Sequence, residues 1–263
     1  MKKLQLFLGI SCLLVLISPM SAYADNADTN TVSKQITEGF PLDTNHLGTL
    51  ETLRVNDVYI HLYHGTDMAG VNSYVIETAH KLIVLDAQHF KSQGAEVRKF
   101  IDFLEKDVER VIVSHAHADH FMALGNFADL PTFSTGETKI IIENEGDGVR
   151  RARLAMGEPF ASEYPDSVAI PTNVLEASFS VDGVDYEVSN YTNTEAKDQL
   201  VLTIPSIHAV FTSDLIIENV HLMFIDADAY IDTLNTIKSL NDTGYTRIMT
   251  GHGSLALVQF YST

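Results

Sequence analysis

The chain has 263 residues, and its 17 basic and 35 acidic side chains give a formal charge of −18 at pH 7. Its 45% of apolar residues can fill a sizeable core, and its 20% of charged residues is too low for a disordered chain. So acidic a chain lacks the basic surface that binds nucleic acid, and charge does not draw it to anionic lipid. We therefore expect a globular protein that acts on a small molecule and binds no nucleic acid.

The first 24 residues are typical of a signal peptide. Lys2 and Lys3 precede an apolar stretch over residues 4–17, and small residues follow up to Ala24, where signal peptidase would cut. The stretch is short for a membrane span, so an uncleaved anchor is the less favoured alternative. Cleavage removes two lysines and no acid, which changes the charge from −18 to −20, and it also removes Cys12, the one cysteine. We predict an exported protein, periplasmic or secreted, without a membrane span or disulfide after cleavage.

Residues 25–45 are polar and are predicted to be a loose terminus, so we place the folded domain over residues 46–263. Apolar alternation and β-branched residues predict strands in the first half over residues 58–63, 73–77, 81–86 and 110–114. Apolar residues at helical spacing predict helices over residues 94–106, 120–128 and 148–156.

The second half has the same mixed pattern. Asp182 and Gly183 are a strong hairpin signal between two short apolar runs, and Pro205 and Ser206 predict another tight turn. Strands are predicted over residues 178–181, 186–189, 200–204, 209–212 and 247–250, with a helix over residues 227–240. Strands, helices and then strands again indicate an α+β fold in which helices cover two sheets.

The most informative segment spans residues 111–120 and reads VIVSHAHADH. His115 and His117 are two positions apart, so their imidazoles face the same way where the predicted strand ends. Asp119 and His120 follow in the turn toward the next helix and can face a second point nearby. Three imidazoles and a carboxylate suit zinc or a similar divalent ion. A chance cluster is the alternative, but composition produces this pattern in roughly one chain in a thousand.

This H-x-H-x-D-H pattern resembles the signature of the metallo-β-lactamase superfamily, and the resemblance extends over roughly residues 50–255. It includes the run over residues 72–77 and the strand end over residues 84–86. The resemblance implies a four-layer αββα sandwich with one or two metal ions at the edge of the sheets.

The resemblance also implies three ligands farther along the chain. His252 matches the family's last histidine, and Asp214 matches the carboxylate that bridges two ions. Where most members have a histidine, this chain has Glu195 in a Thr-Glu-Ala segment similar to the alkyl sulfatase branch, in which the glutamate binds metal. The implied ligands are His115, His117 and Glu195 for one ion, Asp119, His120 and His252 for the other, and Asp214 for both.

These ligands imply a binuclear metallo-hydrolase. Two close ions share a hydroxide of lowered pKa and polarise the scissile group, and Asp119 orients that hydroxide. Two zinc ions are expected. Manganese and iron are the alternatives, because the carboxylate of Glu195 is a harder ligand than an imidazole and suits harder metal ions. The bond cleaved is of the ester, lactone, sulfate or lactam type, and the fold does not choose among them. The alternative functions are a mononuclear iron oxidoreductase of the same fold and a non-catalytic metal-binding protein.

Several other residues keep two interpretations. Asp86 either orients a metal-bound histidine or caps a strand, and His64 either lines the substrate cleft or faces solvent from a loop. The basic run over residues 149–153 is interpreted as a solvated helix face, with anion binding as the alternative. Three histidines are interpreted as structural or surface residues, namely His89, His208 and His221. Three tyrosines are unranked candidates for substrate contact, namely Tyr164, Tyr191 and Tyr230. Only 11 residues follow His252, where the family has a closing helix, so we expect either a compact or a shortened domain.

Overall fold

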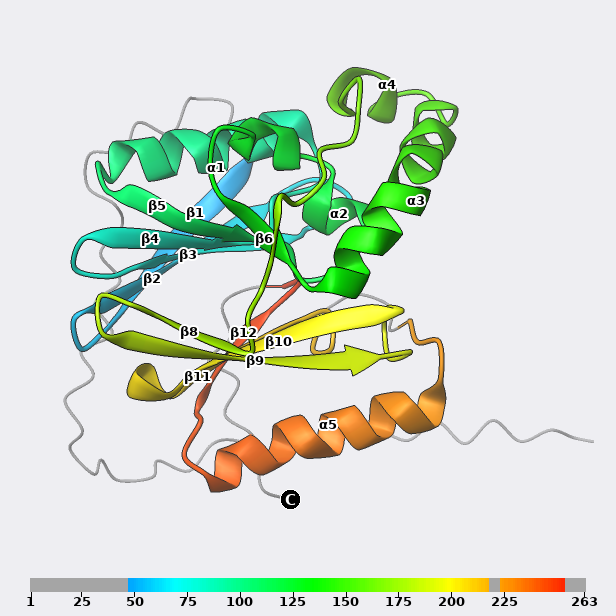
Figure 1. The fold of residues 1–263 in the computed structure, drawn as a ribbon. Coiled ribbons are helices and arrows are strands. Elements are labelled where there is room, and N and C mark those ends of the chain that lie inside the picture. The colour runs from blue at the N-terminus through cyan, green and yellow to red at the C-terminus, as the bar shows by residue number, and fades with distance from the viewer. Residues whose placement is uncertain (1–46, 218–222, 254–263) are drawn as a thin grey trace, which may run out of the picture.

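The computed structural model describes residues 47–217 and 223–253. The predicted signal peptide, the polar segment 25–45, His221 and the last ten residues lie outside the described residues. Two β-sheets pack face to face, and helices cover the outer face of each (Figure 1). No helix in the described part of the chain is long and apolar enough to cross a membrane.

The first sheet has seven strands within the described residues, arranged in chain order. They are β1 (Gly48–Val55), β2 (Val58–Gly65), β3 (Asn72–Glu77), β4 (Lys81–Leu85), β5 (Asp107–Ile112), β6 (Thr132–Ser134) and β7 (Asn173–Val174). The first four pair antiparallel, and β5, β6 and β7 continue the sheet parallel to β4. The helices α1 (Lys91–Phe103), α2 (Ala118–Phe121), α3 (Gly136–Leu154) and α4 (Phe160–Glu163) lie on its outer side (Figure 1).

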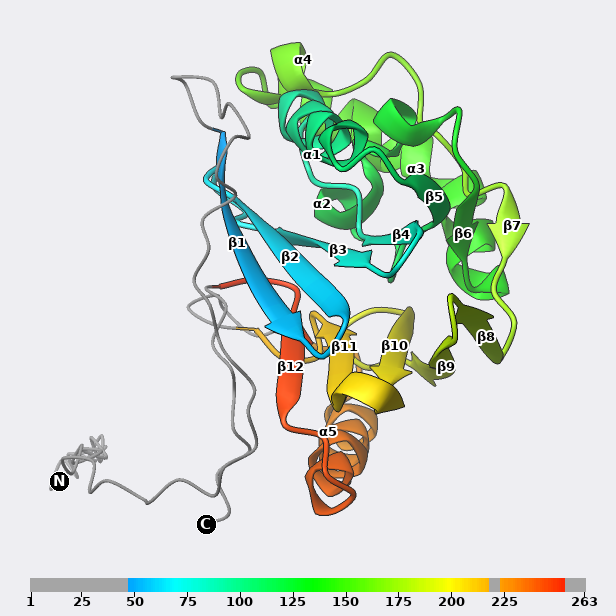
Figure 2. The same cartoon turned by 90° about the vertical axis from the view of Figure 1, so that its left-hand side faces the viewer.

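The second sheet follows entirely in the second half of the chain. Its order is β12 (Arg247–Thr250), β11 (Ala209–Ser213), β10 (Asp198–Ile204), β9 (Val184–Thr192) and β8 (Ser178–Val181). The strands β11 and β12 are parallel, and the other neighbours are antiparallel. The helix α5 (Ala227–Asp242) covers the outer face, so the layers run α, β, β, α, as expected (Figure 2).

Side-chain alternation along the strands explains this layering. In β3, Tyr74 and Ile76 enter the core between the sheets, whereas Val75 packs toward the helices of the first layer. In β10, Leu202 enters the same central core, while Val201 faces α5. Because both faces of these strands are covered, apolar residues follow one another without alternation in their central stretches, over 74–76 in β3 and 200–202 in β10.

The predicted helices over residues 120–128 and 148–156 are corrected by the structure. The first is two short pieces, α2 and a 3-10 turn over Leu124–Phe127, and it starts two residues earlier than predicted. The second starts twelve residues earlier, at Gly136, because the side chain of Thr135 caps it by accepting a hydrogen bond from Thr138 N. Gly146 and Gly148 disfavour a helix and lie between its first ten residues and the rest of the predicted segment, so the sequence pattern does not show that the two parts form one helix.

Smaller differences concern strands and boundaries. The strands β1, β6 and β7 were not predicted, since β1 has exposed residues along much of its length and the other two are only three and two residues long. The helix α1 runs over 91–103 rather than 94–106, and β5 ends at Ile112 rather than Ser114. The predicted hairpin at Asp182 and Gly183 joins β8 to β9. The remaining predicted strands and the helix over residues 227–240 agree with the structure to within a few residues.

Candidate metal centre

Strand ends from both sheets meet at one edge of the sandwich and carry the candidate ligands and Asp86. The neighbouring parallel strands β4 and β5 lead into Asp86 and the histidine-rich motif. In the second sheet, the parallel strands β11 and β12 lead into Asp214 and His252. Because parallel strands end at the same edge, residues from both halves of the chain come together there.

The histidine-rich motif lies in the loop after β5 and in α2 rather than on the strand itself. His115 makes an isolated backbone bridge with Gln199 of β10, and Leu200 N donates to Ser114 O at 3.0 Å. The motif is therefore fixed to the second sheet by main-chain hydrogen bonds. His117 is the N-cap residue of α2, and Asp119 and His120 are within its single turn.

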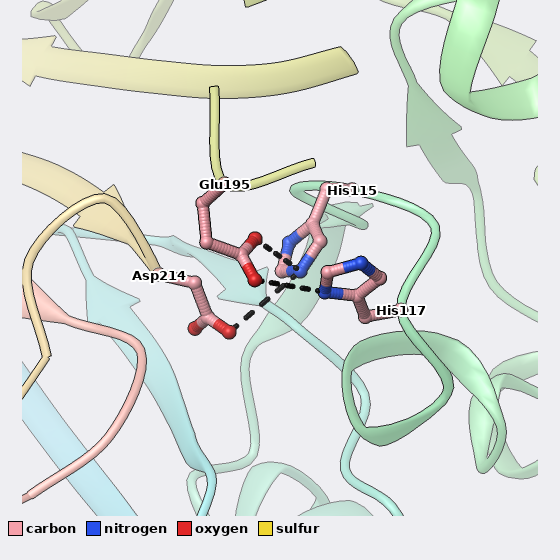
Figure 3. Close-up of side chains that lie close together, drawn as sticks. All are labelled: His115, His117, Glu195 and Asp214. Atoms are coloured by element: carbon pink, nitrogen blue, oxygen red, sulfur yellow. Dashed lines mark ion pairs between the residues drawn. The ribbon is translucent and has the colours of Figure 1, made fainter. Parts of the chain in front are cut away.

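The first cluster consists of four side chains that point toward a common centre (Figure 3). Glu195 Oε1 lies 3.2 Å from His117 Nδ1, and Glu195 Oε2 lies 3.6 Å from His115 Nε2. Asp214 Oδ2 lies 3.8 Å from the same nitrogen of His115. Glu195 is thus placed between the two histidines, where the sequence analysis expected a ligand.

The second cluster shares Asp214 with the first. His120 Nε2 lies 3.2 Å from Asp214 Oδ1 and 3.6 Å from Asp119 Oδ2. His252 Nε2 lies 3.3 Å from Asp214 Oδ2 and 3.4 Å from Asp119 Oδ2. The structure therefore brings all seven predicted ligands together, in the two groups that the sequence analysis named.

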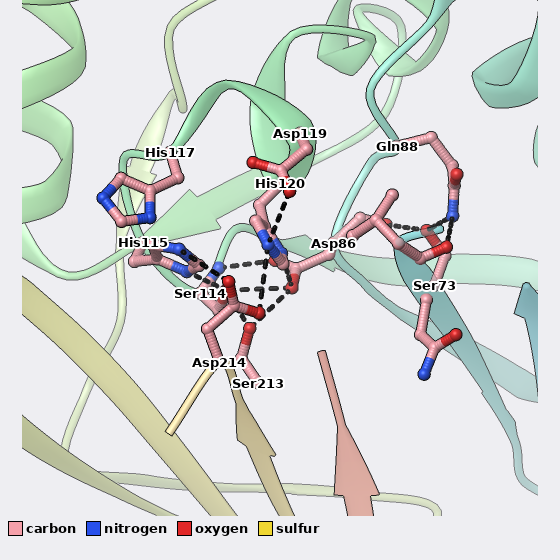
Figure 4. A network of polar contacts seen from close by, with 12 residues as sticks. Ser73, Asp86, Gln88, Ser114, His115, His117, Asp119, His120, Ser213 and Asp214 are labelled. Carbon is pink, nitrogen blue, oxygen red and sulfur yellow. Dashed lines mark hydrogen bonds and ion pairs between the residues drawn. The ribbon is translucent and has the colours of Figure 1, made fainter. Parts of the chain in front are cut away.

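A second ring of contacts fixes the orientation of these imidazoles. Asp86 Oδ2 accepts a hydrogen bond from His120 Nδ1 at 2.8 Å, and Asp86 Oδ1 accepts one from Ser114 N at 2.8 Å (Figure 4). His252 Nδ1 donates to Ala69 O at 2.8 Å. Because their Nδ1 atoms carry the hydrogens, Nε2 of His120 and of His252 is left to face the centre. Of the two interpretations of Asp86, the contacts favour orientation of a histidine.

Sequence reasoning missed Gln199 and the steric role of Gly251, which it noted only as part of the Gly-His-Gly turn around His252. In the amide orientation that satisfies both neighbours, Gln199 Nε2 donates to Glu195 Oε2 at 3.2 Å and Gln199 Oε1 accepts from Asp214 N at 3.2 Å. A Cβ atom on Gly251 would lie 1.8 Å from Asp214 Oδ1, so only glycine fits there. The sole sequence signal for Gln199 is a polar amide inside the apolar strand β10.

The electrostatic environment lowers the pKa of His115 and raises the pKa values of His120 and His252. Burial lowers the pKa of His115 well below 6.5, and the neighbouring His120 and His117 lower it further. Burial acts the same way on His120, but three carboxylates outweigh it and raise the pKa of His120 well above 6.5. For His252, burial is outweighed by Asp119 and Asp214, which raise its pKa to about 10.

The three carboxylates of the centre also have shifted pKa values, because burial raises them and nearby histidines lower them. Burial raises the pKa of Glu195 more than His117 lowers it, so the pKa lies above 4.5. Burial also acts on Asp119 and Asp214, but the nearby His120 outweighs it and holds both pKa values below 3.8. In the protein without metal, protons on the histidines therefore balance buried carboxylates, and a divalent cation can take their place.

Several buried polar atoms at the centre have no hydrogen-bond partner, which tests whether a metal fits. These atoms are His115 Nε2, His120 Nε2 and Asp214 Oδ1. The last two approach to 3.2 Å without forming a hydrogen bond. Lone-pair donors that converge without bonding one another are what a cation site requires, and nitrogen with carboxylate oxygen suits zinc or a related divalent ion.

The structure also shows the surroundings of the other histidines and tyrosines that were considered as candidates. His64 belongs to β2, not to a loop, and its Nδ1 lies 2.7 Å from Asn72 Oδ1. His89 is buried between Asp67 and Tyr164, whereas His208 is exposed. Tyr230 donates to Leu215 O, and Tyr191 packs with the cluster beneath α5.

Known proteins were compared with the chain. The model of the metallo-beta-lactamase superfamily matches residues 66–252. A metallo-beta-lactamase from Pontibacter korlensis superposes with a TM-score of 0.60 at 16% identity, covering 78% of this chain and 92% of that one. The metallo-beta-lactamase FIM-1 of Pseudomonas aeruginosa, in a mono-zinc form, superposes with a TM-score of 0.60 at 16% identity, covering 82% of this chain and 91% of that one. The metallo-beta-lactamase IND-7 superposes with a TM-score of 0.61 at 17% identity, covering 79% of this chain and 91% of that one. No curated protein matches the chain in sequence.

Proposed function

Because the chain belongs to the metallo-beta-lactamase superfamily, we propose that it is an exported, metal-dependent hydrolase with two divalent ions in one centre. The observation that supports this most directly is the convergence of orphaned nitrogen and oxygen atoms from both sheets on two adjacent points. His115, His117 and Glu195 would hold one ion, Asp119, His120 and His252 would hold the other, and Asp214 would contribute to both. When bound, the two ions supply an activated water and a Lewis acid for the electrophile.

The protein side chains orient the reactants. Asp119 contacts His120 and His252 through Oδ2 and lines the cavity, so Oδ1 would be the atom that accepts a hydrogen bond from a bound water. Its low pKa keeps this carboxylate ionised, so it can accept a hydrogen bond from a water and align it for attack. No serine or cysteine nucleophile is required for this chemistry.

The carboxylate of Glu195 in place of an imidazole adds one negative charge to the first site. A more negative site withdraws less electron density from a bound electrophile and accepts harder ions, so we expect zinc with manganese as the nearest competitor. The likeness of the Thr-Glu-Ala segment to the alkyl sulfatase branch favours esters, including sulfate esters and lactones, over β-lactams as substrates.

Metal content of the purified mature protein, measured by elemental mass spectrometry, tests the proposal first. About two equivalents of zinc or manganese are expected, followed by turnover of at least one member of a panel of lactone, sulfate ester, phosphodiester and β-lactam substrates. One equivalent of iron would instead support the oxidoreductase alternative. Absence of metal after supplementation would support a non-catalytic scaffold.

A further inference from the structure

The metal centre opens into two adjoining cavities that share one wall. The first, of about 290 Å³, is lined by the metal-centre residues and by Arg153 of α3. The second, of about 360 Å³, extends from the candidate metal centre beneath α3 and the segment after residue 222. Ala116, His117, Glu195, Val149 and Met223 line both cavities, so a ligand seated over the centre can reach into each.

Arg153 is the one lysine or arginine among the described residues that line the first cavity. Arg150 and Arg151 on the same helix both pair with Asp147, at 2.8 Å and 2.6 Å. Arg153 has no carboxylate partner in the described ranges; its guanidinium lies 5.6 Å from the ring centre of Phe160, and Nη1 lies 3.9 Å from Met156 Sδ. Nη1 donates to this thioether sulfur, and the remaining donors of the guanidinium have no partner among the described residues, so they are available to an acidic group.

The second cavity offers a different surface. Ile141, Phe224 and Ile225 contribute apolar lining, and Phe224 and Ile225 keep about half of their surface exposed. Lys197 also lines this cavity, but it pairs with Glu145 at 2.6 Å and adds no net charge. Apolar side chains left this exposed beside a catalytic centre indicate a ligand that covers them.

Charge decides where an anionic group can lie. The chain as a whole carries −18, which repels anions, and the three carboxylates of the centre offset most of the charge of two divalent ions. The unpaired guanidinium of Arg153 is thus the local feature that favours an anion in the cleft.

We propose that the substrate is an amphiphilic anion. Its acidic group pairs with Arg153, its apolar substituent lies against Phe224 and Ile225, and its hydrolysable bond lies between them at the metal centre. This inference rests on the proposed hydrolase function for the identity of the reacting bond, but the two binding surfaces can be tested without catalysis.

Calorimetric titration of the metal-loaded protein with 1-octanesulfonate and with 1-octanol tests the surfaces separately. The sulfonate carries the charge but is a weak metal ligand and contains no hydrolysable bond. We expect wild-type protein to bind the sulfonate more tightly than the alcohol, and Arg153→Met to lose about tenfold in sulfonate affinity with little change for the alcohol. Arg153→Lys should restore part of this loss.

Two further variants separate the charge from the apolar wall. Arg151→Met removes a neighbouring charge that does not line the cavity, so sulfonate binding should stay at the wild-type level. Phe224→Ser should weaken both ligands by a similar factor. Equal sulfonate affinities in Arg153→Met and Arg151→Met, or no measurable binding of the sulfonate to wild-type protein, would overturn the inference. Hydrolysis of the substrate panel is scored independently, so a failure of the proposed function would be seen separately.

Discussion

Glu195 is the side chain that most sets this centre apart from a histidine-rich one. It is buried, its two oxygens face His115 and His117, and Gln199 supports Oε2 from behind. Glu195→Ala removes one of the four donors at the first site, so we expect metal content to fall from about two equivalents toward one, with activity falling in parallel. Elemental analysis and a hydrolysis assay on the same preparation measure both.

Two variants serve as controls for Glu195→Ala, one at another ligand of the same ion and one at an exposed carboxylate away from the centre. His117→Ala should reproduce the loss, because it removes another donor of the same ion. Glu143→Ala removes an exposed carboxylate of α3 and should retain full stoichiometry. Unchanged metal content in Glu195→Ala would exclude Glu195 as a ligand.

Gly251 is a second residue on which the centre depends, although it contributes no side chain. A Cβ atom there would lie 1.8 Å from Asp214 Oδ1 and 2.9 Å from Asp214 N. Gly251→Ala must push Asp214 away from both groups of ligands, so we expect loss of bound metal without global unfolding. Gly148→Ala is the matched control, because nothing lies within 4 Å of its new Cβ and alanine favours the helix by up to about 1 kcal/mol. Normal metal content in Gly251→Ala would show that Asp214 can relocate.

At the scale of elements, the loop over residues 66–71 links the metal centre to the helical layer. Its Ala69 carbonyl orients His252, and its Asp67 accepts a hydrogen bond from the buried His89 at 2.9 Å. The same Asp67 accepts from Gly70 N at 3.0 Å, which closes the loop on itself. The loop is thus held in place by hydrogen bonds to the helical layer and within itself, not by contacts across the cavity that it borders.

His89→Leu should therefore act at a distance. It leaves Asp67 buried without its partner, which costs about 3 kcal/mol of unfolding free energy, and it frees the loop that orients His252. Urea unfolding should show the destabilisation, and competition with a chelator should show weaker retention of one ion. Tyr164→Phe preserves the pair between His89 and Asp67 and should cost only about 1 kcal/mol. Destabilisation with unaltered metal retention would mean that the loop does not position His252.

A partly buried carboxylate beneath α1, with a histidine and a lysine as its partners, gives the first sheet a pH-dependent stability. Glu77 of β3 contacts His61 at 2.8 Å and Lys106 at 2.7 Å, and although burial raises its pKa, these contacts outweigh burial and hold it below 4.5. A carboxylate with a lowered pKa stabilises the folded state above its unfolded pKa, and this contribution disappears as the pH falls through the folded pKa.

Glu77→Gln should therefore lower the unfolding free energy by about 1–2 kcal/mol at pH 7, and its difference from wild type should shrink below about pH 4. Chemical denaturation at a series of pH values measures this difference directly. Glu51→Gln, at an exposed position of β1, should show no comparable effect. A penalty that is constant with pH would mean that packing, not ionisation, is responsible.

Sequence patterns predict the ligands of this centre better than the elements that carry them. The spacing of His115, His117 and His120 identifies a metal motif whether the backbone is a strand, as predicted, or a loop and one helical turn, as found. The resemblance adds Glu195, Asp214 and His252, which lie far along the chain. The role of Gln199 depends on tertiary contacts between β10 and the motif, and the role of Arg153 depends on which face of α3 borders the cleft, so neither can be read from local sequence.

At the scale of the whole molecule, the metal centre joins the two sheets. The motif after β5 belongs to the first sheet, while Glu195, Asp214 and His252 follow strands of the second. Bound ions therefore stabilise the contact between the halves as well as the site. At free metal about a thousandfold above its Kd, one ion adds roughly 4 kcal/mol to the folded state.

Removal of the ions by a chelator should lower the melting temperature by about 10 °C, as followed by circular dichroism. The His117→Ala variant should respond less, because it has less metal to lose. An identical melting temperature with and without chelator would show that the centre contributes nothing to holding the sheets together.

The order of the strands has one more consequence. Within the described residues, β1 to β7 form one sheet and β8 to β12 the other, so the chain passes from the first sheet to the second at a single connection between Val174 and Ser178. Separation at this connection would yield two contiguous fragments, one with four ligands and one with three, and neither could form a complete centre alone. Metal would then be the signal for their assembly, and the two fragments could serve as the basis of a split reporter for divalent ions.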